Sequence, residues 1–151
     1  MYLIGHAAIG MTLAAGTNEP VLAFGIGWLS HYLADLIPHG DEDAGEWVKR
    51  GHEVKRLLAL VGIDSMLLLA AYAWFVAHRG FSPAPLAAAL GSAIPDVMWG
   101  LEKVFKRNLF GWHERLHHKN HNYFRVRMPL WAGLAFQGAL TALLWYRLTL
   151  G

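Results

Sequence analysis

Cysteine is absent from this chain, and charged residues are scarce. Without cysteine the protein has neither a disulfide framework nor a thiolate metal site, so imidazole and carboxylate groups must hold any metal ion. Asp, Glu, Lys and Arg make up only 16% of the 151 residues, whereas a soluble domain carries about 25% charged residues. This shortage of charge, together with the 55% of residues that are hydrophobic, indicates a membrane protein.

Signals for nucleic-acid binding and for secretion are also missing. The formal net charge of +2 is too small to indicate a nucleic-acid partner, and the aromatic residues lie in apolar runs rather than among Lys and Arg. No basic segment precedes the first apolar run, so we expect no cleaved signal peptide. We therefore expect one membrane-embedded domain over residues 1–151, with membrane lipid as its partner and no nucleic acid.

Apolar runs predict the helices of this domain. A membrane-spanning helix needs about 20 predominantly apolar residues, within a range of roughly 17 to 25. The third run meets this length outright, whereas the first is short enough to be a re-entrant helix. Pro95 should kink or divide the fourth run. The expected fold class is all-α, a polytopic membrane bundle of four to five transmembrane helices. The runs are residues 2–15, 21–37, 57–77, 85–101 and 130–146.

The basic residues predict the orientation of the bundle. If all five runs cross the membrane, the N-terminus and the two long loops, 38–56 and 102–127, lie on the same side. That side holds every Lys and Arg except Arg79 and Arg147. Because Lys and Arg gather in cytoplasmic loops, we expect the N-terminus and both long loops in the cytoplasm.

Histidine and aspartate residues concentrate towards the cytoplasmic ends of these runs. At a rise of about 1.5 Å per residue, they fall in one layer although they come from distant parts of the chain. Ionisable groups are costly inside a membrane and persist there mainly where they bind something or pair with one another. The candidate metal ligands are His6, His31, Asp35, Asp64, Asp96, His117 and His121.

Local spacing supports a metal site. His31 and Asp35 are four residues apart and would share one face of a helix, as would His117 and His121 if their segment is helical. Neutral imidazole and carboxylate groups suit zinc, manganese and iron. We expect zinc, with manganese or iron as alternatives, and the ligands suffice for one or two ions.

Two segments of the chain resemble a known family. Residues 30–39 read Ser-His-Tyr-Leu-Ala-Asp-Leu-Ile-Pro-His and residues 91–96 read Gly-Ser-Ala-Ile-Pro-Asp. Both are similar to segments of the membrane-bound metal-dependent hydrolases, as are the early His6 and the His-rich segment 113–121. The first segment also resembles, locally, a metal-ligand segment of zinc-dependent phospholipase C. The resemblance implies a small bacterial inner-membrane protein with metal-dependent hydrolase activity.

A metal-dependent hydrolase with its His/Asp site at the cytoplasmic face is therefore the expected function. A lipid or phosphoester substrate suits that location, because Lys and Arg of the two loops could hold its phosphate. His39 and Asp41, at the edge of the polar layer, are the expected catalytic residues and would carry protons.

Other functions fit the same residues. His113-x3-His117-His118 resembles one histidine box of the membrane di-iron desaturases and hydroxylases. Histidine could also ligate haem. A non-enzymatic membrane protein stapled by a closed metal site, or a transporter, is a further alternative. Iron content and visible absorption would distinguish the two iron proteins from a zinc hydrolase.

Overall fold

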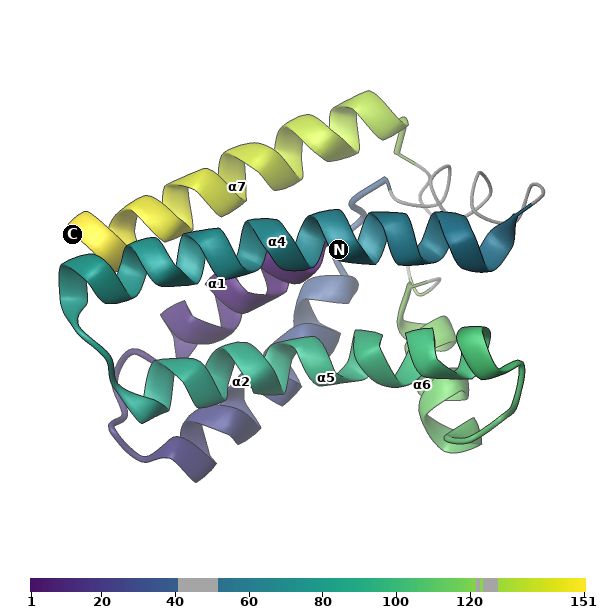
Figure 1. The fold of residues 1–151 in the computed structure, drawn as a ribbon, viewed down its shortest axis with the longest axis horizontal. Coiled ribbons are helices and arrows are strands. Elements are labelled where there is room, and N and C mark those ends of the chain that lie inside the picture. Colours follow the sequence, from purple (N-terminus) through teal and green to yellow (C-terminus); the bar gives the residue numbers. More distant parts are fainter. Residues whose placement is uncertain (41–51, 122, 124–127) are drawn as a thin grey trace.

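The computed structural model describes residues 1–40, 52–121, 123 and 128–151, and the side chains of His118 and His121 lie outside that description. The described residues form helices and no strands, which confirms the all-α prediction. Figure 1 shows long helices lying lengthwise with shorter ones beside them. The helices are α1 (Leu3–Leu13), α2 (Pro20–Asp35), α4 (Glu53–Arg79), α5 (Pro83–Phe105), α6 (Gly111–His121) and α7 (Leu130–Leu150).

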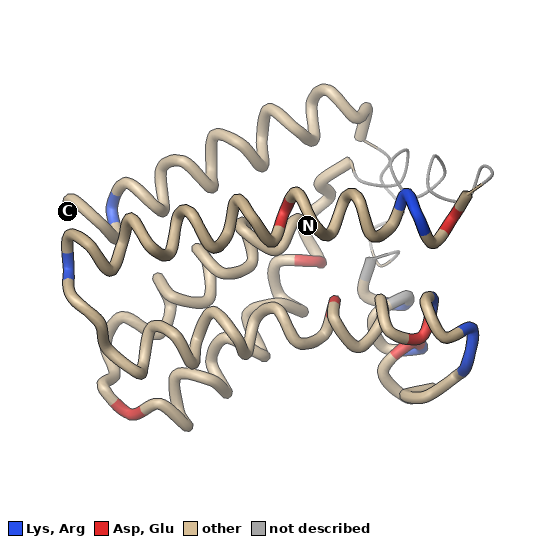
Figure 2. The backbone as a smooth tube through the Cα atoms, viewed as in Figure 1, with Lys and Arg blue, Asp and Glu red and all other residues tan. Residues whose placement is uncertain are grey.

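Among the described helices, α4 and α5 are long and apolar enough to cross a membrane. Much of their surface is apolar and exposed, as Leu67, Leu69 and Leu90 illustrate. Figure 2 shows Lys and Arg towards the two ends of the bundle and none in its middle, whereas some Asp or Glu residues lie midway. This distribution agrees with a membrane protein, because uncompensated charge is excluded from the apolar middle of a bilayer.

The first two helices are shorter than a bilayer is thick. The 11 residues of α1 cover roughly 16 Å and the 16 residues of α2 roughly 24 Å, against about 30 Å of hydrocarbon. The N-terminus therefore lies beside the middle of α4 rather than at an end of the bundle (Figure 1). The first apolar run is a half-length helix whose beginning is inside the protein.

Proline positions explain where two helices start. Pro20 and Pro83 stand in the first turns of α2 and α5, where a missing N–H costs no hydrogen bond. Pro95 lies inside α5, which nevertheless continues to Phe105. Pro95 therefore does not divide the fourth apolar run into two helices. A proline is tolerated inside a membrane helix because neighbouring groups can satisfy the carbonyl that it frees.

Glycines bring α2 and α5 into close contact. A Cβ atom on Gly27 would collide with the carbonyl of Ala88, and one on Gly91 would collide with the carbonyl of Phe24. Small residues at such contacts let two helix backbones approach closely in a membrane. Gly27 is one turn before His31, so this contact fixes the part of α2 that carries the polar residues.

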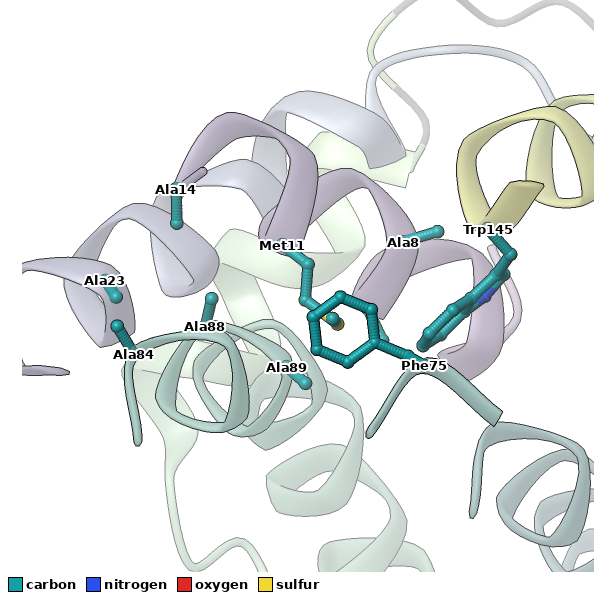
Figure 3. Close-up of a cluster of buried hydrophobic side chains, with 10 residues drawn as sticks. Ala8, Met11, Ala14, Ala23, Phe75, Ala84, Ala88, Ala89 and Trp145 are labelled. Carbon is teal, nitrogen blue, oxygen red and sulfur yellow. The ribbon is translucent and has the colours of Figure 1, made fainter. Parts of the chain in front are cut away.

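An alanine-rich apolar cluster holds the other half of the bundle together. Figure 3 shows Met11 of α1, Phe75 of α4 and Trp145 of α7 among small side chains of α2 and α5. These larger side chains fill the space between helices, while alanine keeps α2 and α5 close. The buried members are Ala7, Ala8, Met11, Ala14, Ala23, Phe75, Ala84, Ala88, Ala89 and Trp145.

Replacing Gly27 by Ala is expected to destabilise the protein. The added methyl group cannot be accommodated without separating α2 from α5, and overpacking of this kind costs about 1–3 kcal/mol. Thermal unfolding of the detergent-purified protein measures the effect. Gly25→Ala is the matched control, because a Cβ atom on Gly25 meets open space. Equal melting temperatures for the two variants would contradict the close contact.

Candidate metal centre

Asp35, the last residue of α2, lies at the centre of a buried polar cluster. His31, one turn earlier, places its Nε2 atom 3.1 Å from Asp35 Oδ2. His6 of α1 places its Nε2 atom 3.1 Å from Asp35 Oδ1. All three side chains are buried. The α1–α2 packing thus brings His6 to one oxygen of a carboxylate whose other oxygen already faces His31 of the same helix.

Asp96 of α5 supplies a second carboxylate. Its Oδ1 atom lies 3.9 Å from His31 Nε2, and its Oδ2 atom lies 3.9 Å from His6 Nε2. The side chain of Asp96 is 23% exposed, whereas those of Asp35, His6 and His31 are fully buried. Asp96 therefore lies at the edge of the cluster, in contact with the surroundings of the protein.

His117 of α6 completes the cluster from outside the long helices. Its Nε2 atom lies 3.3 Å from Asp96 Oδ1 and 3.5 Å from Asp35 Oδ2. The side-chain amide of Asn120 donates a hydrogen bond to the carbonyl of Tyr32, which ties α6 to α2. The helical form of residues 111–121 thus turns His117 towards residues more than eighty positions earlier in the chain.

The hydrogen bond of His31 fixes which nitrogen can bind a metal ion. His31 Nδ1 lies 2.9 Å from the carbonyl oxygen of Ser92. A carbonyl only accepts hydrogen bonds, so Nδ1 carries the hydrogen and Nε2 keeps the lone pair. Metal-binding histidines commonly use this arrangement, in which the second ring nitrogen donates to an acceptor that orients the ring.

The buried atoms of this cluster fit a metal ion. His6 Nε2 and His31 Nε2 are buried without a hydrogen-bond partner, although each lies close to carboxylate oxygen. A buried polar group left unsatisfied costs about 1–3 kcal/mol, and a divalent cation would satisfy both nitrogens. Two sets of ligand atoms, each within 4.8 Å of one another, could hold an ion: His6, His31 and Asp96, and His31, Asp35 and His117.

Asp64, which was also expected to bind metal, belongs to neither set. It lies midway along α4 and accepts hydrogen bonds from the backbone N–H groups of Leu3 at 2.5 Å and Ile4 at 3.2 Å. The first N–H groups of any helix lack partners within that helix. Asp64 therefore caps the beginning of α1 from a neighbouring helix, at the point where α1 starts inside the protein.

His39 lies at the edge of the cluster and is buried. Its Nδ1 atom donates to the carbonyl of Ile37 at 2.6 Å, so its Nε2 atom accepts from the Met1 amino nitrogen at 2.6 Å. The Met1 nitrogen also donates to Asp35 Oδ1 at 3.1 Å. His39 Nε2 is 4.0 Å from the same oxygen. The expected proton carrier is thus beside the candidate metal ligands.

Two expected site residues are not placed by the structure. Asp41 lies outside the described residues. The backbone of His121 ends α6, but its side chain also lies outside the description. The proton-carrier role of Asp41 and the ligand role of His121 stay predictions.

Gln137 is a site residue that the sequence did not reveal. From α7, its Oε1 atom accepts from the N–H of Tyr2 at 3.1 Å and its Nε2 atom donates to the carbonyl of His39 at 2.6 Å. Gly133, one turn earlier, lets α7 approach this same carbonyl, which a Cβ atom would strike. The available signal was a polar side chain within the apolar run 130–146.

His113 extends the cluster beyond the expected ligands. It is fully buried, and its ring stacks on that of His117 with the centroids 5.5 Å apart. The rings of His117 and His31 stack in turn at 5.6 Å, and those of His31 and His6 at 4.0 Å. Burial, reinforced by His117 and His31, lowers the pKa of His113, so its imidazole is neutral near pH 7.

Comparisons with known proteins leave the family of this chain open: no family model matches it, and neither the curated proteins nor the solved structures include a significant match. The resemblance to the membrane-bound metal-dependent hydrolases therefore stays an expectation. Function has to be inferred from the side chains that the fold brings together.

Proposed function

We propose that this protein is a membrane-embedded, metal-dependent hydrolase. The observation that carries the proposal is the convergence of three imidazole Nε2 atoms, from α1, α2 and α6, on two carboxylates. Zinc is the expected ion, with manganese and iron as alternatives, because the donor atoms are nitrogen and oxygen without thiolate. The ligands would be His6, His31, Asp35, Asp96 and His117.

The arrangement of the side chains suits hydrolysis. A divalent ion held here would act as a Lewis acid and lower the pKa of water towards about 7. The partly exposed edge at Asp96 offers the side of the cluster at which a substrate could arrive. His39 Nε2 lies 4.0 Å from Asp35 Oδ1 and accepts a hydrogen bond from the Met1 amino group, so His39 could relay a proton between the site and that amino group. His31 and Asp35 are buried, so this part of the site is shielded from solvent.

The surroundings favour a lipid or another amphiphilic phosphoester as substrate. We place the protein in the bacterial inner membrane with four or five spanning helices and with its N-terminus and both long loops in the cytoplasm. The support is the apolar surface of α4 and α5 and the concentration of basic residues in two loops. Exposed cations that could hold a phosphate lie around the α5–α6 connection, at Lys106, Arg107, Arg115 and Lys119.

Metal content and hydrolysis together test the proposal. The wild-type protein, purified in detergent and reconstituted with zinc, manganese or iron, should retain metal and hydrolyse phosphodiester or carboxylic ester reporters. Asp96→Ala should lose both properties, because it removes the partly exposed carboxylate of the cluster. Glu19→Ala is the matched control, since this exposed acidic residue at the other end of the bundle contacts none of the candidate ligands.

Each other outcome points to a different function. Retained iron with visible absorption and oxygen consumption would replace the hydrolase by a di-iron oxidoreductase, whereas a Soret band would indicate haem. Retained zinc without hydrolysis of any reporter would indicate a structural metal. A wild-type protein that binds no metal after reconstitution would overturn every metal-dependent function.

A further inference from the structure

The two carboxylates of the candidate centre each face histidine on two sides. Asp35 meets His6 through Oδ1 at 3.1 Å, and it meets His31 and His117 through Oδ2 at 3.1 and 3.5 Å. On the His6 side, Oδ1 also accepts from the Met1 amino nitrogen at 3.1 Å and lies 4.0 Å from His39 Nε2. The two oxygens of this one carboxylate thus serve different histidines.

Asp96 repeats this division. His6 approaches it through Oδ2 at 3.9 Å, whereas His31 and His117 approach it through Oδ1 at 3.9 and 3.3 Å. Both carboxylates are therefore divided in the same sense, with His6 facing one oxygen of each and the pair His31/His117 facing the other. Two carboxylates with this arrangement have the form of bridging ligands.

The lone pair of His31 assigns this residue to a single ion. His31 donates through Nδ1 to the Ser92 carbonyl, which leaves one lone pair, on Nε2, for one ion. His6 stacks beside it with the ring centroids 4.0 Å apart, and both Nε2 atoms face Asp35. Paired ions in two-metal hydrolytic sites are about 3.5–4 Å apart, a spacing that neighbouring stacked rings can match.

We propose that the site holds two divalent ions bridged by Asp35 and Asp96, one on the His6 side and one on the His31/His117 side. This inference rests on the proposed metal-dependent function. A paired site of this kind can hold both the attacking and the leaving oxygen of a phosphoester. A phosphoester is therefore the substrate that this inference predicts.

Manganese provides the test, because its electron paramagnetic resonance reports whether two ions are neighbours. Wild-type protein reconstituted with Mn²⁺ should contain two ions per chain by elemental analysis and give an exchange-coupled spectrum. His6→Ala should retain one ion and give the hyperfine sextet of isolated Mn²⁺, and His117→Ala should do the same. His78→Ala is the control and should match the wild type, because His78 lies at the far end of α4.

The outcomes separate this inference from the proposed function. One ion per wild-type chain with an isolated sextet would overturn the paired site and leave a single-metal hydrolase. Two ions without exchange coupling would also overturn it, because bridging carboxylates couple the ions. No bound manganese, zinc or iron would overturn the metal-dependent function itself. The wild-type measurements decide between these outcomes even if a variant fails to fold.

Discussion

Replacing Asp35 by Asn should leave the purified protein without bound metal. The substitution keeps the size of the side chain but removes its charge and one of its two acceptor oxygens. Asp35 contacts His6, His31 and His117, as Asp96 also does. Asp35 contacts the Met1 amino group and His39 in addition, so its replacement removes more interactions from the centre than replacement of Asp96 does. Substitutions in the outer shell of a metal site typically weaken metal binding about 10- to 100-fold, and loss of this carboxylate should exceed that range.

Metal retention after dialysis against a chelator, followed by elemental analysis, measures this effect. Glu19→Gln removes a carboxylate next to the first residue of the same helix and should retain metal like the wild type, because Glu19 is exposed. A circular dichroism spectrum equal to that of the wild type would show that Asp35→Asn still folds. Undiminished metal content in a folded Asp35→Asn variant would show that the ion binds elsewhere.

Replacing Asp64 by Leu should lower the stability of the protein more than it lowers metal affinity. The change leaves the N–H groups of Leu3 and Ile4 without their acceptors inside the protein, and each buried donor that loses its partner costs about 1–3 kcal/mol. His6 follows one turn after this capped end, so a loosened α1 should weaken metal binding only through the position of His6. Thermal unfolding and a metal titration measure the two effects.

Asp64→Asn separates the capping role from the ligand role that the sequence suggested. Asparagine keeps one acceptor oxygen, so it should restore part of the lost stability and bind metal within about 10-fold of the wild type, the lower end of the effect of an outer residue. If Asp64→Asn loses metal as completely as Asp35→Asn does, then Asp64 is a ligand in solution.

Many residues of the polar cluster could be predicted from the sequence, because a charged side chain within an apolar run is easily recognised. A charged or imidazole side chain within an apolar run is rare enough to indicate a role, and the spacing of His31 and Asp35 follows directly from the helical repeat. The positions of these residues near one end of their runs then indicated that helices distant in sequence would bring them together.

The hydrogen-bond partners of individual atoms could not be predicted from the sequence in the same way. Asp64 is a carboxylate at the same depth in its apolar run as the candidate metal ligands. Because α1 is short and begins inside the protein, its first backbone N–H groups meet the Asp64 oxygens instead. Gln137 looked like a tolerated interruption, since nothing in α7 indicates that residues 2 and 39 lie against it. Long-range contacts of this kind depend on how the helices pack, which a local repeat does not encode.

The position of α6 in the chain has a consequence for biogenesis. The first carboxylate and its two nearest imidazoles, at Asp35, His31 and His6, are synthesised early, whereas His117 follows after two further long helices. Until residue 117 has left the ribosome and α6 has docked, the nascent helices carry an incomplete set of ligands. If the protein binds metal as proposed, loading with metal would be a late step in maturation, and a chain truncated before α6 would remain an apoprotein.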